Sequence, residues 1–167
     1  MFTYILSIFL LVSCSNNNKQ ASGTSSDKPS NTENNYLTMK INGVEWTADN
    51  NIFGAYHPKG YNKVIMISGS KGKKDKNEIP FNINIYNTKG PGEFTFSQGN
   101  KDLSVAQIAN WSAEEFICGS MMGFDMKVNV TKASSNPDII EATFSGVITC
   151  NTDRTMNITD GKFYYHE

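Results

Sequence analysis

Alternating apolar and polar residues dominate the chain from residue 36 onward and predict β-strands. The clearest example is a hairpin, in which two alternating segments flank Asn42-Gly43, a dipeptide that favours a two-residue type I′ turn. Such a turn pairs Met39 with Trp46 and Ile41 with Val44, so every apolar side chain of the hairpin should lie on one face. We therefore expect two antiparallel strands on either side of the turn.

Similar patterns predict further strands at 52–57, 63–68, 81–86, 93–96, 103–111, 124–131, 139–148 and 156–165. The parity of the apolar positions changes at Asp160-Gly161, which predicts a bulge with the glycine in the left-handed region. Ser112 and Glu115 have the spacing of a capping box and allow at most one short helix. We expect an all-β fold, an antiparallel β-sandwich or flattened barrel of about nine or ten strands.

The first residues form a separate apolar segment. Residues 2–12 are mostly apolar, and Leu11-Val12-Ser13-Cys14 resembles the lipobox of bacterial lipoprotein signals. That resemblance implies removal of residues 1–13 and acylation of Cys14; a plain secretory signal is the alternative. As a helix the segment would span roughly 16 Å, about half of a bilayer core, which argues against a membrane span. No Lys or Arg precedes Cys14, which departs from the usual positive start of a signal.

The organisation that follows has two parts. Residues 14–35 comprise the lipidated cysteine and a polar segment without aromatic residues, which we expect to be a flexible tether. Residues 36–167 form a single β-domain. Ser15 stands where an Asp retains enteric-type lipoproteins at the inner membrane, so resemblance to that sorting rule implies an exported protein anchored to the outer membrane of the cell envelope.

Charge and cysteine content limit the partners. The 167 residues include 15 Lys and Arg and 16 Asp and Glu, a net charge of −1, so nucleic acid is not an expected partner. With Cys14 assigned to lipid, Cys118 and Cys150 form an even pair in a compartment that permits disulfides. A turn near Ser134 would place them opposite each other on adjacent strands, and we expect a bond between them.

Candidate chemistry is sparse. The thiol of Cys118 with Met121, Met122 and Met126 would suit Cu(I), but the expected disulfide argues against a metal. No Gly-x-Ser-x-Gly nucleophile motif is present, and adjacent carboxylates such as Glu114 and Glu115 point in different directions. We therefore expect no catalytic residues, metal or cofactor, with an envelope hydrolase as the less favoured alternative.

Two groups of residues are candidates for binding. One is a possible sugar-stacking platform, although most aromatic residues of a small sandwich belong to its core. Its members are Trp111, Tyr56, Tyr61 and Tyr86. The other is a basic loop that could contact anionic groups, although such loops are commonly only solvated. Its members are Lys71, Lys73, Lys74 and Lys76.

A wider resemblance rests on four short motifs. They are Asn42-Gly43 with Trp46, Gly90-x-Gly92-x-Phe94, Phe144-Ser145-Gly146 and the closing 158–163 segment Ile-Thr-Asp-Gly-Lys-Phe. In this order the chain resembles a group of small, uncharacterised bacterial lipoproteins with one β-domain. The resemblance implies location and fold, and no catalytic residue. We predict a non-catalytic binding or structural domain with an envelope protein or glycan as partner; a calycin-like barrel carrying a small apolar ligand is the alternative.

Overall fold

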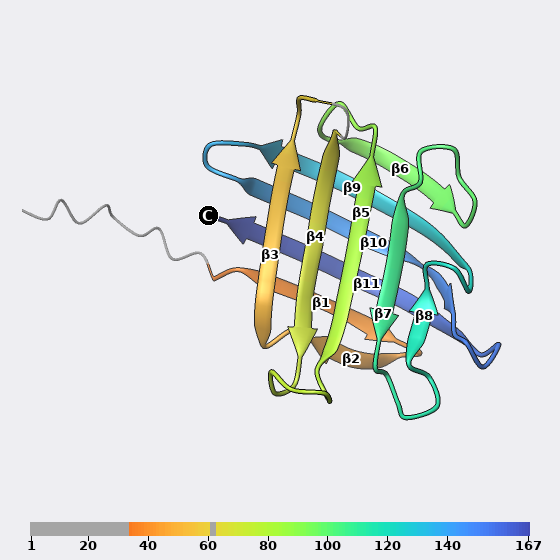
Figure 1. Cartoon of the computed structure of the whole chain (residues 1–167). Helices are drawn as coiled ribbons and strands as arrows, with labels where there is room; N and C mark the ends of the chain where they lie inside the picture. Colours follow the sequence, from red (N-terminus) through yellow and green to blue (C-terminus); the bar gives the residue numbers. More distant parts are fainter. Residues whose placement is uncertain (1–33, 61–62) are drawn as a thin grey trace, which may run out of the picture. The chain divides into compact units, whose positions relative to one another are not determined.

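The computed structural model describes residues 34–60 and 63–167, all within the unit Thr32–Glu167. These residues form eleven strands and no helix, arranged as two antiparallel sheets that pack face to face as a sandwich (Figure 1). The all-β prediction is confirmed. The sheets are not closed into a barrel, so the fold required by the calycin-like alternative is absent. The predicted signal, Cys14 and Tyr61 lie outside the described residues.

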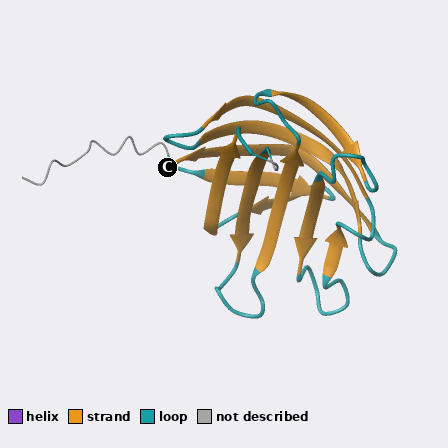
Figure 2. Cartoon of the chain, turned by 45° about the horizontal axis from the view of Figure 1, so that its top comes forward, coloured by secondary structure: helices purple, strands orange, loops and turns teal. Residues whose placement is uncertain are grey.

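Each sheet combines strands from different parts of the chain. The six-stranded sheet has the order β2-β1-β11-β10-β9-β6, and the five-stranded sheet has the order β3-β4-β5-β7-β8. Figure 2 shows the two layers, with loops joining the strand ends. The strands are β1 (Tyr36–Ile41), β2 (Val44–Thr47), β3 (Asn50–His57), β4 (Val64–Lys71), β5 (Ile79–Tyr86), β6 (Gly92–Ser97), β7 (Val105–Ala109), β8 (Ile117–Gly119), β9 (Phe124–Ser134), β10 (Ile139–Thr149) and β11 (Thr155–His166).

The β1–β2 hairpin has the predicted register, with Met39 opposite Trp46 and Ile41 opposite Val44. Trp46 is 2% exposed, as expected for a core residue. Val44 shares the face of Ile41, as predicted, but it is 70% exposed and does not belong to the core. The reason is position: Val44 begins edge strand β2 directly after the turn, where it has no neighbouring strand on its outer side.

The inner faces of the two sheets form one core. Phe81 from the five-stranded sheet stacks on Phe144 from the six-stranded sheet, with ring centroids 5.5 Å apart. Trp46 packs against the same Phe81 at 6.2 Å. Burial of such large side chains removes apolar surface from water and contributes about 1.5–3 kcal/mol for each. These contacts, together with the other buried residues of both sheets, fix which side of each strand faces inward.

The predicted bulge occurs at Asp160-Gly161, where the pairing of β11 shifts against both neighbouring strands. The left-handed residue is Asp160, with φ of 54°, and not Gly161 as predicted. The Asp160 carboxylate lies 2.9 Å from the Lys40 ammonium, and this hydrogen bond and charge lower the pKa of Asp160 below its ordinary value. Gly161 is required for a different reason: a Cβ there would lie 2.4 Å from the Phe144 ring.

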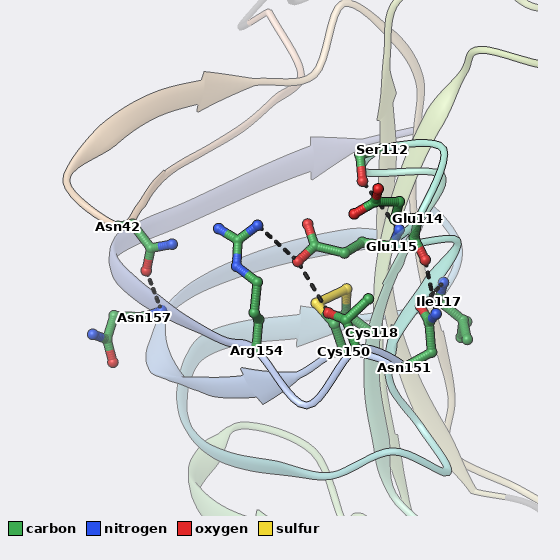
Figure 3. Close-up of a disulfide and its surroundings, with 11 residues drawn as sticks. Asn42, Ser112, Glu114, Glu115, Ile117, Cys118, Cys150, Asn151, Arg154 and Asn157 are labelled. Atoms are coloured by element: carbon green, nitrogen blue, oxygen red, sulfur yellow. Dashed lines mark hydrogen bonds and ion pairs between the residues drawn. A yellow bond between two sulfur atoms is a disulfide. The ribbon is translucent and has the colours of Figure 1, made fainter.

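The helix allowed at 112–115 does not form in the described structure. The Glu115 N–H donates to Ser112 Oγ at 3.0 Å, as in a capping box, but the chain then enters β8. The buried Glu115 carboxylate instead accepts a hydrogen bond from Thr152 and pairs with Arg154 at 3.1 Å (Figure 3). The acceptor oxygens of Glu115 are therefore satisfied by Thr152 and Arg154, and they do not require the backbone N–H that a capping box would supply at the start of a helix.

The disulfide between Cys118 and Cys150 is present, with the Cα atoms 3.8 Å apart (Figure 3). The two cysteines lie opposite each other in an antiparallel bridge, as predicted, but, contrary to the prediction, this bridge is not part of the β9–β10 hairpin. Cys118 lies on β8 of the five-stranded sheet, whereas Cys150 directly follows β10 of the six-stranded sheet, so the bond joins the two sheets. The register of β9 with β10 places Phe124 opposite Ile148. Residues 120–123 connect β8 of the five-stranded sheet to β9 of the six-stranded sheet.

Loss of this cross-link should destabilise the fold. The cysteines are separated by 32 positions, and a closed loop of this length contributes about 3–4 kcal/mol by the loop-entropy model. We expect the double variant Cys118→Ala, Cys150→Ala to lose that much free energy of unfolding in urea denaturation. The wild type in dithiothreitol is the control and should approach the variant. Equal stability of the oxidised wild type and the variant would show that the bond contributes nothing.

Crowding at the bulge gives a second prediction. We expect Gly161→Ala to lower the free energy of unfolding by about 2–3 kcal/mol, because the new Cβ meets both the ring and the carbonyl oxygen of Phe144. The matched control is Gly43→Ala, where no atom lies within 4 Å and only the left-handed backbone costs about 1 kcal/mol. Urea denaturation compares the two variants. A smaller loss for Gly161→Ala than for Gly43→Ala contradicts the crowding argument.

Candidate functional site

The outer face of the five-stranded sheet is the most distinctive surface of the described domain. In Figure 1 this sheet lies in front, with its outer face toward the viewer. Ile65, Ile67 and Ile83 are fully buried, so the alternate positions of β4, β5 and β7 point outward. We call eight of these outward residues the neutral face: Val64, Met66, Ser68, Asn82, Asn84, Tyr86, Val105 and Gln107.

The eight members, on β4, β5 and β7, include no Lys, Arg, Asp, Glu or His, and all of them are buried or half-buried. Next to Val64 on the edge strand β3, the outward residue is the exposed His57. The outer face of the six-stranded sheet is the opposite case, exposed and rich in both charge signs. Its outward positions include Glu45, Glu93, Asp125, Lys127, Glu141 and Lys162. A solvated sheet face is normally polar and charged. The contrast between the two faces therefore needs an explanation beyond solubility.

Three carboxamides form the polar part of the neutral face. Asn82 lies opposite Gln107 in the β5–β7 pairing, and Asn84 follows Asn82 on the same side of β5. Opposed residues have Cβ atoms about 5 Å apart and successive outward residues about 7 Å. Within the described residues none of the three side chains makes a hydrogen bond. Each amide can therefore donate to and accept from a ligand.

A hollow of about 660 Å³ adjoins this face. Tyr86 and Val105 belong to both, so the hollow continues the neutral face beyond the end of β5. Its other walls are Asn87, Lys101, Asp102, Leu103 and Ser120. Leu103 is 77% exposed and has a φ of 58°, a left-handed conformation that a leucine rarely adopts.

Hydrogen bonds hold Leu103 in this conformation. The Asn100 side chain donates to the carbonyl oxygens of Ser97 and Ser104 and accepts from the Ser104 N–H at 2.9 Å. Ser104 Oγ accepts the Tyr86 N–H at 3.0 Å, which ties the loop to the end of β5. The fold thus keeps an apolar side chain in water at the rim of the hollow, at a backbone cost on the order of 1–3 kcal/mol.

The predicted aromatic platform is not assembled by the structure. Tyr56 belongs to the core and is 9% exposed, and Tyr86 ends β5 on the neutral face. Trp111 lies toward the other end of β5, because the side chain of its neighbour Asn110 donates to the Glu78 carbonyl just before that strand begins. A strand of eight residues separates the two ends by roughly 25 Å. Tyr61 lies outside the described residues.

The predicted basic loop is present between β4 and β5. Lys71 ends β4, and Lys73, Lys74 and Lys76 are exposed beyond it. The Gly72 N–H donates to the Asp49 carboxylate at 3.0 Å, and this bond is the main reason that the pKa of Asp49 is lowered. The loop therefore has an acidic group of the domain itself at its base, and its role in anion binding stays a prediction.

The structure leaves no basis for the soft-metal alternative at Cys118. Its sulfur is bonded to Cys150, and Met126 is fully buried in the core while Met121 is 78% exposed. Among the described residues no three His, Cys, Asp or Glu side chains are grouped so that they could hold a metal ion.

Sequence reasoning missed the amides and Leu103. Asn82 and Asn84 alternate with apolar residues, a pattern that predicts outward positions on a strand but does not distinguish a ligand contact from an ordinary solvent-facing side chain. Leu103 was assigned to a strand, because nothing local indicates that an exposed leucine occupies a left-handed position. The signal that could have directed attention here is the absence of any charged residue from Phe81 to Tyr86.

Comparison with protein-family models, with curated proteins and with solved structures finds no match. In the part of the chain that the structure describes, no helix has the length and apolarity needed to cross a membrane. The chemistry of the neutral face and its hollow must therefore be argued from their own residues.

Proposed function

We propose that this chain is a lipid-anchored envelope lipoprotein whose β-sandwich is a non-catalytic binding domain. The observation that carries the binding role is the neutral face, which combines three unpaired amides with two residues, Tyr86 and Val105, that also line a hollow. The lipobox Leu11-Val12-Ser13-Cys14 supports the anchor. Binding surfaces combine apolar contact area with a few well-placed polar groups, and this face has both.

The positions of the perturbed titratable groups agree with a binding role. Shifts in pKa mark many catalytic sites, since acids and bases are tuned by burial and by charged neighbours. Here Lys40, Asp49, Asp160 and Tyr165 have shifted pKa values, and none of the four belongs to the neutral face or lines its hollow. Lys40 and Asp160 line a separate hollow of about 410 Å³ on the six-stranded sheet. Lys40 and Asp160 shift because they pair with each other, which is a structural cause.

The anchor and the binding face support one arrangement. An acylated Cys14 with two or more chains would hold stably in a membrane. We propose that the polar sequence between Cys14 and the domain links the acylated cysteine to the β-sandwich. The outer membrane is the proposed location, on the resemblance of Ser15 to the sorting rule.

Acylation of Cys14 is the direct test of the anchor. Metabolic labelling of cells with an alkyne fatty acid, followed by click detection, should tag the wild-type chain and leave Cys14→Ala untagged, because the thioether and amide links both form on that residue. The double variant Cys118→Ala, Cys150→Ala is the matched control and should remain tagged. Equal tagging of the wild type and Cys14→Ala, or tagging of neither, would refute the anchor.

A further inference from the structure

We infer that the neutral face and its hollow bind an uncharged glycan. This inference rests on the proposed binding function and names the class of its ligand. It is argued from the chemistry of the eight neutral-face residues and of the loop that holds Leu103.

The absence of charge selects against ionic ligands. An acidic polymer needs cations to offset the loss of its hydration, and a basic one needs carboxylates. The neutral face offers neither among its residues. Two charged residues, Lys101 and Asp102, line the hollow, and because they are opposite in sign they add no net charge to it.

The amides select against a purely apolar ligand. An apolar surface covering Asn82, Asn84 and Gln107 would remove water from three side chains that have no protein partner, leaving their donors and acceptors unsatisfied. A ligand with many hydroxyl groups satisfies them, because each hydroxyl both donates and accepts and each amide does the same. A neutral ligand dense in hydroxyl groups is a carbohydrate.

The apolar members of the site fit the same ligand. Tyr86, Val105 and Leu103 gather at the hollow and offer aromatic and aliphatic surface to the C–H faces of sugar rings. The exposed Leu103 side chain, held there against its backbone preference, has the position of a contact residue. The hollow volume of about 660 Å³ lies within the range of roughly 300–1,000 Å³ usual for small-molecule sites.

The site is longer than the hollow. It continues from Tyr86 through the Asn84–Val105 pair to the Asn82–Gln107 pair, along the direction of β5. Such a linear arrangement suits several consecutive sugar units better than one monosaccharide, because additional units add contacts without new ordering of the protein.

The test uses the full chain, purified in detergent, in biolayer interferometry against immobilised polysaccharides. The neutral panel is dextran, mannan, galactan and xylan, and the acidic panel is polygalacturonate and alginate. We expect retention by at least one neutral polymer and by neither acidic one. Retention only by acidic polymers, or by none of the panel, overturns the inference.

The near-isosteric variants Asn82→Asp, Asn84→Asp and Gln107→Glu localise the site, because they keep the shape and add one charge. We expect each to weaken binding of the retained neutral polymer by about tenfold or more, since a carboxylate must lose water to meet a hydroxyl. The matched control is Asn129→Asp on the outer face of the six-stranded sheet, which should leave binding unchanged. Equal effects at Asn82 and Asn129 would place the ligand elsewhere.

Leu103→Gly separates binding from folding. Glycine relieves the left-handed backbone, so we expect the melting temperature to rise by about 4 °C while polysaccharide binding weakens several-fold. A residue with only a structural role would not lose binding as the protein becomes more stable. Unchanged binding by a stabilised Leu103→Gly chain removes Leu103 from the site.

The outcomes also separate this inference from the proposed function. Alkyne tagging of Cys14 without polysaccharide retention refutes the glycan inference and leaves the proposed anchor intact. Retention without tagging refutes the anchor and leaves the glycan inference intact. A photo-crosslinking residue placed at Ser68, beside the amides, should give no discrete protein adduct in cells. A single protein adduct that Asn84→Asp abolishes would identify a protein partner and overturn the glycan assignment.

Discussion

The packing of the two inner sheet faces against each other is the constraint on which the rest of the structure depends. Phe81 on Phe144 couples the sheets at their centre, and a strand whose inner side is fixed cannot slip by one residue without exposing its core side chains. The outward residues are therefore fixed as well. Asn82 and Gln107 are held opposite each other on the outer face because the residues next to them on each strand are fixed in the core.

Local pattern was sufficient for much of this architecture. The Asn42-Gly43 turn, the alternation of β9 to β11 and the bulge at Asp160 all follow from spacing that a strand imposes within a few residues. The setting of the disulfide does not. Long-range packing decides whether the segment before β9 continues the β9–β10 hairpin or belongs to the five-stranded sheet. Gly119 permits the second arrangement, because its φ is 80° and its backbone lies close to the Ala106 carbonyl.

The candidate site shows a similar limit. Aromatic residue type alone suggested a platform, but Tyr56 is inward by strand parity and Trp111 and Tyr86 lie toward opposite ends of β5. The sequence shows the amides as polar residues of predicted strands, and that pattern alone gives them no particular role. What distinguishes them is collective: the neighbouring strands also present uncharged residues, and no partner within the described fold satisfies their hydrogen bonds.

The disulfide and the neutral face are linked through β8. This strand has three residues, pairs only with β7 within its sheet, and places Gly119 opposite Gln107. A strand so short contributes little pairing energy of its own, and the bond from Cys118 to Cys150 fixes it to the opposite sheet. With β8 in place, β7 is not an edge strand and Gln107 keeps its position beside Asn82. The covalent link between the sheets thus stabilises the strand that carries one of the three amides.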